Sequence, residues 1–145
     1  MTVWKERLKP ILTQLDDLRD ELACFDYLIG CAGEPGWEFD ETLRRNENLL
    51  KGCDSRMWLD ISVSDEGCLR IRADSDSMLL RGMLILLRKL YENLPVPVSA
   101  AAGLQLLRHP IWKDCFSAKQ LKTLHVVCKH FESIGRKDEH HEKSH

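Results

Sequence analysis

The sequence predicts an α+β domain in which helices pack against a small antiparallel sheet. Two segments, from about Arg56 to Val63 and from Cys68 to Ala73, are rich in strand-forming residues, and the short glycine-containing stretch between them favours an antiparallel hairpin. Helical patterns precede and follow this hairpin. The length of 145 residues suits one domain with a substantial core.

Apolar residues at alternating spacings of four and three predict a first helix from Trp4 to Ile29. Pro10 fits poorly in a helix interior, so we expect the helix to start or to kink there. Gly30 and the stretch 32–36 predict its end. A short coiled coil is the alternative, but a helix that lies on the core of its own domain is more common.

The next helix is predicted to be the central one. Residues 38–48 are polar and leave room for a short helix before the hairpin. After the hairpin, we expect the stretch Asp74–Ser77 to supply N-cap oxygens and negative charge at the start of a helix from Met78 to about Tyr91. Capping is the favoured role of Asp74 and Asp76, and the alternative is that they orient the loop that carries Cys53. This helix is apolar on nearly every face, and Gly82 in its middle predicts the close approach of a neighbouring backbone.

The C-terminal third predicts two further helices. Ser99 caps a short helix that runs through Leu107, and the last helix opens with a capping box over Ser117–Gln120. Gly135 is the expected stop of this last helix. We therefore predict one domain over residues 1–135 and a polar, disordered tail over residues 136–145.

Charge and hydropathy exclude several classes of function. The net charge of -2 at pH 7 provides no basic field for nucleic acid. The longest apolar runs are far too short to span a bilayer, and the N-terminus lacks the apolar stretch of a secretory signal. We therefore expect a cytoplasmic protein that binds neither nucleic acid nor a membrane.

Six cysteines raise the question of metal or disulfide chemistry. Their spacings match no zinc-finger or zinc-ribbon pattern, so no metal site is expected. Disulfides are not expected either, because the cytosol keeps thiols reduced. Most of these cysteines lie beside apolar residues and are expected to be small buried side chains. The six are Cys24, Cys31, Cys53, Cys68, Cys115 and Cys128.

Cys53 differs from the other cysteines. It follows Gly52 in a stretch expected to form a loop before the first strand, where a partner can reach its thiol. Lys51 and Arg56 favour the nucleophilic thiolate, whereas Asp54 opposes it. On this pattern alone, a structural cysteine at the entry to a strand is the more common interpretation.

The residues around Cys53 resemble the signature of the SufE family. In that signature a glycine–cysteine pair is followed by a polar residue, serine, another residue, an apolar residue and tryptophan, which here corresponds to Gly52–Trp58 with Ser55 as the serine. Further matches lie on both sides of the pair, and they are Ala73–Ser77 with Arg81–Met83 and, more weakly, Tyr27–Ile29. The sequence departs from the family pattern at Gly30–Ala32 and at Gln120, where an arginine is usual.

This resemblance implies a SufE/IscU-like α+β fold and a role in sulfur transfer. Cys53 would accept a persulfide sulfur from a pyridoxal-phosphate cysteine desulfurase and relay it to an iron–sulfur scaffold or another acceptor. The chain would hold no cofactor and would act as partner and activator of the desulfurase rather than as an enzyme by itself. We expect the Cys53 sulfur to rest against Leu50 and Met57. The supporting residues would be Gly52, Ser55, Lys51, Arg56 and Asp74.

Two alternatives belong to other classes of protein. An iron–sulfur or metal scaffold needs several ligands at one site, so Cys53 would have to meet Cys115, Cys128 or His125. A non-catalytic interaction module on the same fold is the second alternative, and the absence of the arginine at Gln120 favours it.

Overall fold

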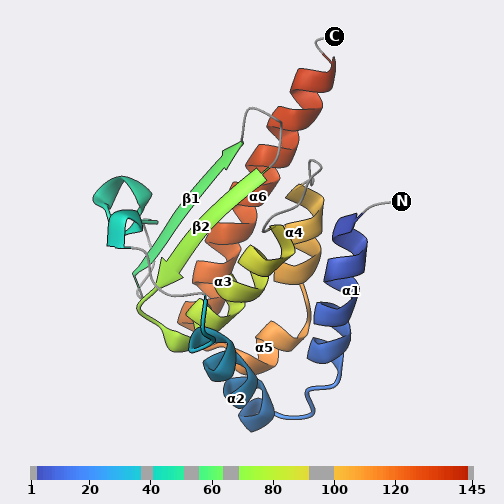
Figure 1. Ribbon diagram of the computed structural model, residues 1–145, viewed down its shortest axis with the longest axis vertical. Coiled ribbons are helices and arrows are strands. Elements are labelled where there is room, and N and C mark those ends of the chain that lie inside the picture. The colour runs from blue at the N-terminus through green and yellow to red at the C-terminus, as the bar shows by residue number, and fades with distance from the viewer. Residues whose placement is uncertain (1–2, 37–40, 51–55, 64–68, 92–99, 144–145) are drawn as a thin grey trace.

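Figure 1 shows the computed structural model, which describes residues 3–36, 41–50, 56–63, 69–91 and 100–143. The two strands pair antiparallel, with Met57 opposite Ser75 and Val63 opposite Leu69. The predicted α+β class with a small antiparallel sheet is therefore confirmed. In chain order the elements are α1 (Val3–Asp16), α2 (Glu21–Ala32), the 3₁₀ turns η1 (Glu41–Leu43) and η2 (Asn46–Asn48), β1 (Met57–Val63), β2 (Leu69–Ser75), α3 (Met78–Tyr91), α4 (Ala100–Leu107), α5 (Ile111–Cys115) and α6 (Ala118–Lys143).

Helix α3 forms the centre of the molecule, as predicted. It packs against α1, α2, α4 and strand β2, while α6 packs against α4. In Figure 1 the hairpin lies on one side of these helices and α1 on the other. The side chains of α3 that have no exposed surface are Leu80, Met83, Leu84, Leu87 and Leu90. Within the described residues, no helix is both long and apolar enough to cross a membrane.

Helices α2 and α3 cross at Gly82. A Cβ atom at this position would lie only 2.2 Å from the backbone oxygen of Leu28. No side chain fits in that space, so the glycine lets the two helix backbones approach each other. This close approach was predicted from the sequence, and it is confirmed.

The predicted first helix is in fact two helices, α1 and α2, and Pro10 lies inside α1. The break follows from Asp20, which has an extended backbone and accepts a hydrogen bond from the Ala23 N–H at 2.8 Å, as the N-cap of α2. The face that α2 buries after the break differs from the predicted apolar stripe, so Leu22 and Ile29 are exposed. The buried face of α2 is formed by Cys24, Leu28, Cys31 and Ala32.

The capping of α3 by the stretch Asp74–Ser77 is confirmed for Ser77 and is wrong for Asp74 and Asp76. Strand β2 continues to Ser75, so Asp74 belongs to the sheet. The cap is Ser77, whose Oγ accepts a hydrogen bond from the Leu80 N–H at 3.3 Å. The carboxylates of the two aspartates bind arginines instead, as described below.

The capping box of α6 is confirmed, because the Ser117 N–H donates to Gln120 Oε1 at 2.9 Å and the Gln120 N–H donates to Ser117 Oγ at 3.2 Å. The predicted stop at Gly135 is wrong, since α6 continues to Lys143. One glycine inside a helix costs only about 1 kcal/mol, and the charged residues that follow are good helix formers. The domain boundary predicted between residues 135 and 136 stays a prediction.

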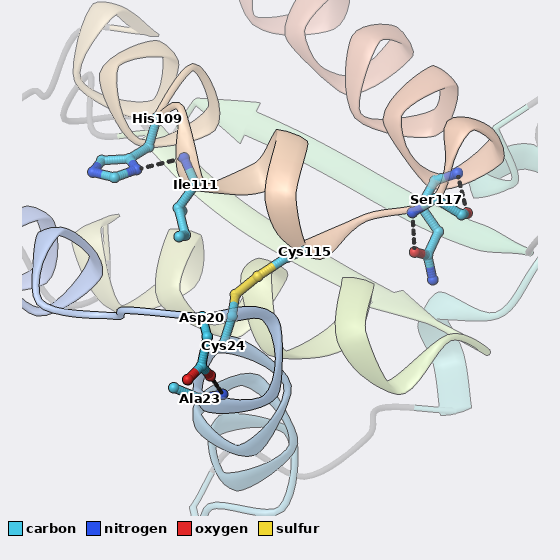
Figure 2. The surroundings of a disulfide bond; sticks show 8 residues. Asp20, Ala23, Cys24, His109, Ile111, Cys115 and Ser117 are labelled. Atoms are coloured by element: carbon cyan, nitrogen blue, oxygen red, sulfur yellow. Dashed lines mark hydrogen bonds between the residues drawn. A yellow bond between two sulfur atoms is a disulfide. The ribbon is translucent and has the colours of Figure 1, made fainter.

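Cys24 and Cys115 form a disulfide that joins α2 to α5 (Figure 2). The expectation of no disulfide is therefore wrong. That expectation rested on the reducing conditions of the cytosol, which carry no information about the distance between two cysteines in the fold. The fold brings the two Cα atoms to 6.2 Å, within the range that a disulfide spans, although the residues are 91 positions apart in the sequence.

Candidate functional site

The segment 51–55 carries Lys51, Gly52, Cys53 and Ser55 and lies outside the described residues. The chain on either side of it is described. The Leu50 N–H donates to the Met57 carbonyl oxygen at 2.9 Å, and an isolated antiparallel bridge pairs Leu49 with Trp58. These contacts bring the two flanks of the segment together at the start of β1.

Leu50 and Met57 are the residues expected to shelter the Cys53 sulfur. Both are buried, with exposed fractions of 8% and 0%. An apolar surface is therefore present at both flanks of the segment 51–55. The contact between these side chains and the sulfur itself stays a prediction, because Cys53 lies outside the described residues.

Arg56 anchors the C-terminal flank of the segment. Its carbonyl oxygen accepts hydrogen bonds from the Asp76 N–H at 3.0 Å and from Ser75 Oγ at 2.9 Å. Its guanidinium Nε donates to Asp76 Oδ2 at 2.8 Å. The side chain of Arg56 is 68% exposed, so this ion pair contributes at most about 1 kcal/mol. The two bonds to the carbonyl oxygen therefore position the backbone more firmly than the ion pair does.

Asp74 is a buried carboxylate between two arginines. Its Oδ2 lies 3.3 Å from Arg44 Nη2, and its Oδ1 lies 3.2 Å from Arg81 Nε. The Ser75 N–H also donates to Oδ1 at 2.8 Å. The side chain is only 4% exposed, and a buried carboxylate stays charged only when such partners compensate for the lost water.

Arg44 connects the two aspartates and covers the tryptophan of the motif. Its Nη1 lies 3.3 Å from Asp76 Oδ1, while its Nη2 faces Asp74. The guanidinium carbon stands 4.5 Å from the centre of the Trp58 ring, in cation–π geometry. Trp58 is 5% exposed, and the Arg44 guanidinium lies over its ring.

These contacts define an arginine–aspartate cluster next to the segment 51–55, and its members are Arg44, Arg56, Arg81, Asp74 and Asp76. Three guanidinium groups face two carboxylates, so the cluster carries an excess of positive charge. A positive charge stabilises a nearby thiolate. The cluster thus fixes the start of β1 and places a net positive charge around Arg56, the residue that follows the segment 51–55.

The sequence predicted part of this cluster. Arg56 and Asp74 were named as supporting residues, and the structure brings both of them into it. Arg44 was missed, because no local pattern distinguishes it from its neighbour Arg45, which forms an exposed pair with Glu47. The only usable signal was the presence of two aspartates after the hairpin, which need basic partners from elsewhere in the chain.

The cysteines that the structure describes do not present exposed thiols. Cys24 and Cys115 are bonded to each other, and Cys31 and Cys128 are free but buried. Burial raises the pKa of the Cys31 thiol, although Lys89 and a hydrogen bond with Tyr27 oppose this effect. Burial likewise raises the pKa of the Cys128 thiol. Cys31 and Cys128 are therefore poor nucleophiles near neutral pH, and Cys24 and Cys115 hold no free thiol while they are bonded to each other.

Metal-binding groups were also considered among the described residues. These residues contain no group of three or more histidine, cysteine, aspartate or glutamate side chains placed to hold a metal ion. His125 is exposed on α6.

Comparison with known proteins assigns the chain to a family. The model of the SufE family, described as an Fe-S metabolism associated domain, matches residues 9–132. SufE-like protein 2, chloroplastic, from Arabidopsis thaliana is 42% identical over 81 residues. This alignment covers 56% of the chain and 31% of the relative, so the chain spans less than a third of that relative's length. Because the family model matches most of the chain, the protein belongs to the SufE family.

Proposed function

We propose that this protein accepts sulfur on Cys53 from a pyridoxal-phosphate-dependent cysteine desulfurase, stimulates that enzyme, and relays the sulfur to iron–sulfur cluster assembly or to another acceptor. Membership of a family associated with Fe-S metabolism supports this role. We also propose a cytoplasmic location, where thiols are kept reduced.

The observation that carries the proposal is the arrangement of the chain around the segment 51–55. The Leu50–Met57 hydrogen bond closes its base, and the arginine–aspartate cluster fixes Arg56 beside it. The four cysteines that the structure describes are buried, and two of them are bonded to each other. The cysteines outside the described residues, Cys53 and Cys68, therefore remain as candidates, and the SufE-like motif around Gly52 and Cys53 favours Cys53.

The proposed transfer is a thiol–disulfide type of exchange. The Cys53 thiolate attacks the outer, sulfane sulfur of the partner's persulfide. A sulfur–sulfur bond forms on Cys53 while the bond within the partner's persulfide breaks, and the partner cysteine leaves as a thiolate. Cys53 then carries the persulfide, and no net oxidation occurs. The positive charge of the cluster favours the attacking thiolate.

The two alternatives find less support. A scaffold that uses Cys115 as a ligand needs its free thiolate, but this sulfur is bonded to Cys24. The interaction module rested on Gln120, which occupies the place of an arginine. The amide of Gln120 donates to Ser77 Oγ at 3.3 Å, so this position still links α6 to the start of α3.

The test is to incubate the protein with a cysteine desulfurase and free cysteine and to measure the masses of its cysteine-containing peptides. The peptide with Cys53 should gain one sulfur atom, and the desulfurase should turn over faster. Cys53→Ser should abolish both effects, because it removes the attacking thiolate.

The matched control is Cys31→Ala, which removes a buried cysteine and should leave both effects largely intact. Circular dichroism should show that both variants are folded. Sulfur acceptance by Cys53→Ser at the rate of the unsubstituted protein would overturn the proposal.

A further inference from the structure

A covalent bond ties together two helices that lie far apart in the chain. Cys24 belongs to the first turns of α2, and Cys115 is the last residue of α5 (Figure 2). Their exposed fractions are 0% and 3%. Neither residue belongs to the arginine–aspartate cluster, and the proposed sulfur transfer uses neither of them.

Helix α5 is short, with five residues, and three of them, Ile111, Trp112 and Cys115, are buried. On the side of α4, the Trp112 indole N–H donates to the Leu106 carbonyl oxygen at 2.9 Å. On the side of α1, His109 Nε2 lies 2.7 Å from Asp16 Oδ1, while His109 Nδ1 accepts the Ile111 N–H at 3.0 Å. The disulfide supplies the covalent link to α2.

The reduced pair also fits the fold. Both cysteines belong to the apolar core cluster, where a thiol behaves as a small apolar side chain. An apolar core is therefore compatible with the two reduced thiols as well as with the disulfide.

We propose that Cys24 and Cys115 are a reversible redox pair, which ties α5 to α2 when oxidised and releases α5 when reduced. A low-molecular-weight disulfide such as oxidised glutathione is the oxidant. One cysteine thiolate attacks a glutathione sulfur and releases the first glutathione thiolate. The second cysteine then attacks the protein sulfur of this mixed disulfide and releases the second glutathione. The two cysteine thiols lose two electrons and two protons, and one glutathione disulfide becomes two glutathione thiols.

The burial of both sulfurs sets the rate of this exchange. A reagent reaches them only when α5 opens locally, so exchange is slow compared with that of an exposed disulfide. The disulfide also restrains the start of α6, since Phe116 follows Cys115 directly and Ser117 begins the capping box. Reduction should therefore loosen residues 111–120 and leave the pairing of β1 with β2 unchanged.

The test equilibrates the full chain in glutathione buffers of increasing oxidised fraction, blocks free thiols with iodoacetamide, and maps peptides without reduction. A peptide pair linked through Cys24 and Cys115 should appear as the buffer becomes oxidising. The melting temperature should rise by roughly 10 °C from the reduced to the oxidised form, because the bond constrains a long stretch of the unfolded chain. Amide exchange over residues 111–120 should slow at the same time.

Three variants test whether the shift in melting temperature comes from Cys24 and Cys115 or from another cysteine. Cys24→Ala and Cys115→Ala should each melt at one temperature in every buffer, close to that of the reduced protein. Cys128→Ala removes a buried cysteine outside the pair and should keep the full shift. If an alanine variant fails to fold, the reduced and oxidised forms of the unsubstituted protein give the same comparison. The proposal is overturned if the linked peptides do not form, or if the shift persists in Cys24→Ala.

Discussion

At the scale of single residues, Asp74 is the side chain on which the arginine–aspartate cluster depends most. Both of its oxygens face guanidinium groups, one from Arg44 and one from Arg81, and the carboxylate has almost no access to water. Removing one partner from a buried group of charges leaves the others without compensation, which is more costly than the loss of an exposed pair. The stability of the protein should therefore be sensitive to the charge at this position.

Asp74→Asn keeps the shape of the side chain and removes its charge. We expect it to lower the free energy of unfolding by about 3 kcal/mol. The control is Asp60→Asn, which breaks the exposed pair between Asp60 and Arg72 and should cost less than about 1 kcal/mol. Urea denaturation measures both values. Equal losses in the two variants would contradict the structural importance of the buried cluster.

The members of this cluster differ in how readily they can be predicted from the sequence. Arg56 and Asp74 lie within or next to recognisable motifs, so both were named from the sequence. Arg44 and Arg81 pair with Asp74 over separations of 30 and 7 residues, and both pairs depend on the folded path of the chain. Arg81 opens one of the motif matches, Arg81–Met83, but the match does not indicate which residue it pairs with, and Arg44 lies in no recognised motif.

At the scale of elements, the crossing of α2 over α3 places a strict limit on side-chain size. Gly82 has no space for a Cβ atom, because the backbone of Leu28 occupies it. For Gly30, on α2, no described atom beyond its chain neighbours and the backbone of its own helix lies within 4 Å of the position where a Cβ would lie. The same substitution at these two glycines should therefore have opposite effects.

Gly82→Ala should force the helices apart and lower the free energy of unfolding by about 3 kcal/mol. Gly30→Ala should raise it by about 0.5–1 kcal/mol, because alanine restricts the unfolded chain and favours the helix. Thermal denaturation followed by circular dichroism compares the two variants. If Gly82→Ala were as stable as the unsubstituted protein, the close crossing would be wrong.

The elements were predicted well where a local signal determines them. The strands, α3 and the capping box of α6 all follow from turn residues, period and caps. The prediction failed at Asp20, because the apolar stripe continues in phase across the break and conceals it. It also failed at Gly135, since a single glycine does not end a helix whose neighbours favour it.

At the scale of the whole molecule, the least predictable feature is the disulfide. Cys24 and Cys115 lie in segments that show nothing about their mutual distance, and the tertiary packing of α2 and α5 alone brings them together. The location of the protein in the cell is a property of this scale as well, and the expected cytoplasmic location stays a prediction.

The stability of the whole molecule should fall in alkaline solution. Burial raises the pKa of the Cys31 and Cys128 thiols, and it raises the pKa of the Tyr27 and Tyr91 hydroxyls. The folded state therefore holds these protons more tightly than the unfolded state does. Their contribution to stability is complete below the ordinary pKa values and is lost as the pH rises toward the folded values.

This loss should begin near pH 8.5 with the thiols and continue above about pH 10 with the tyrosines. We expect the melting temperature to fall by roughly 5 °C between pH 8 and pH 10, measured by calorimetry without reductant so that the disulfide stays intact. A double variant, Cys31→Ala with Cys128→Ala, should show a smaller fall over this range, because only the tyrosines of this group remain to titrate. Recovery of the original melting temperature on return to pH 8 checks that the effect is reversible. If the double variant lost as much stability as the unsubstituted protein, the two buried thiols would not be its source.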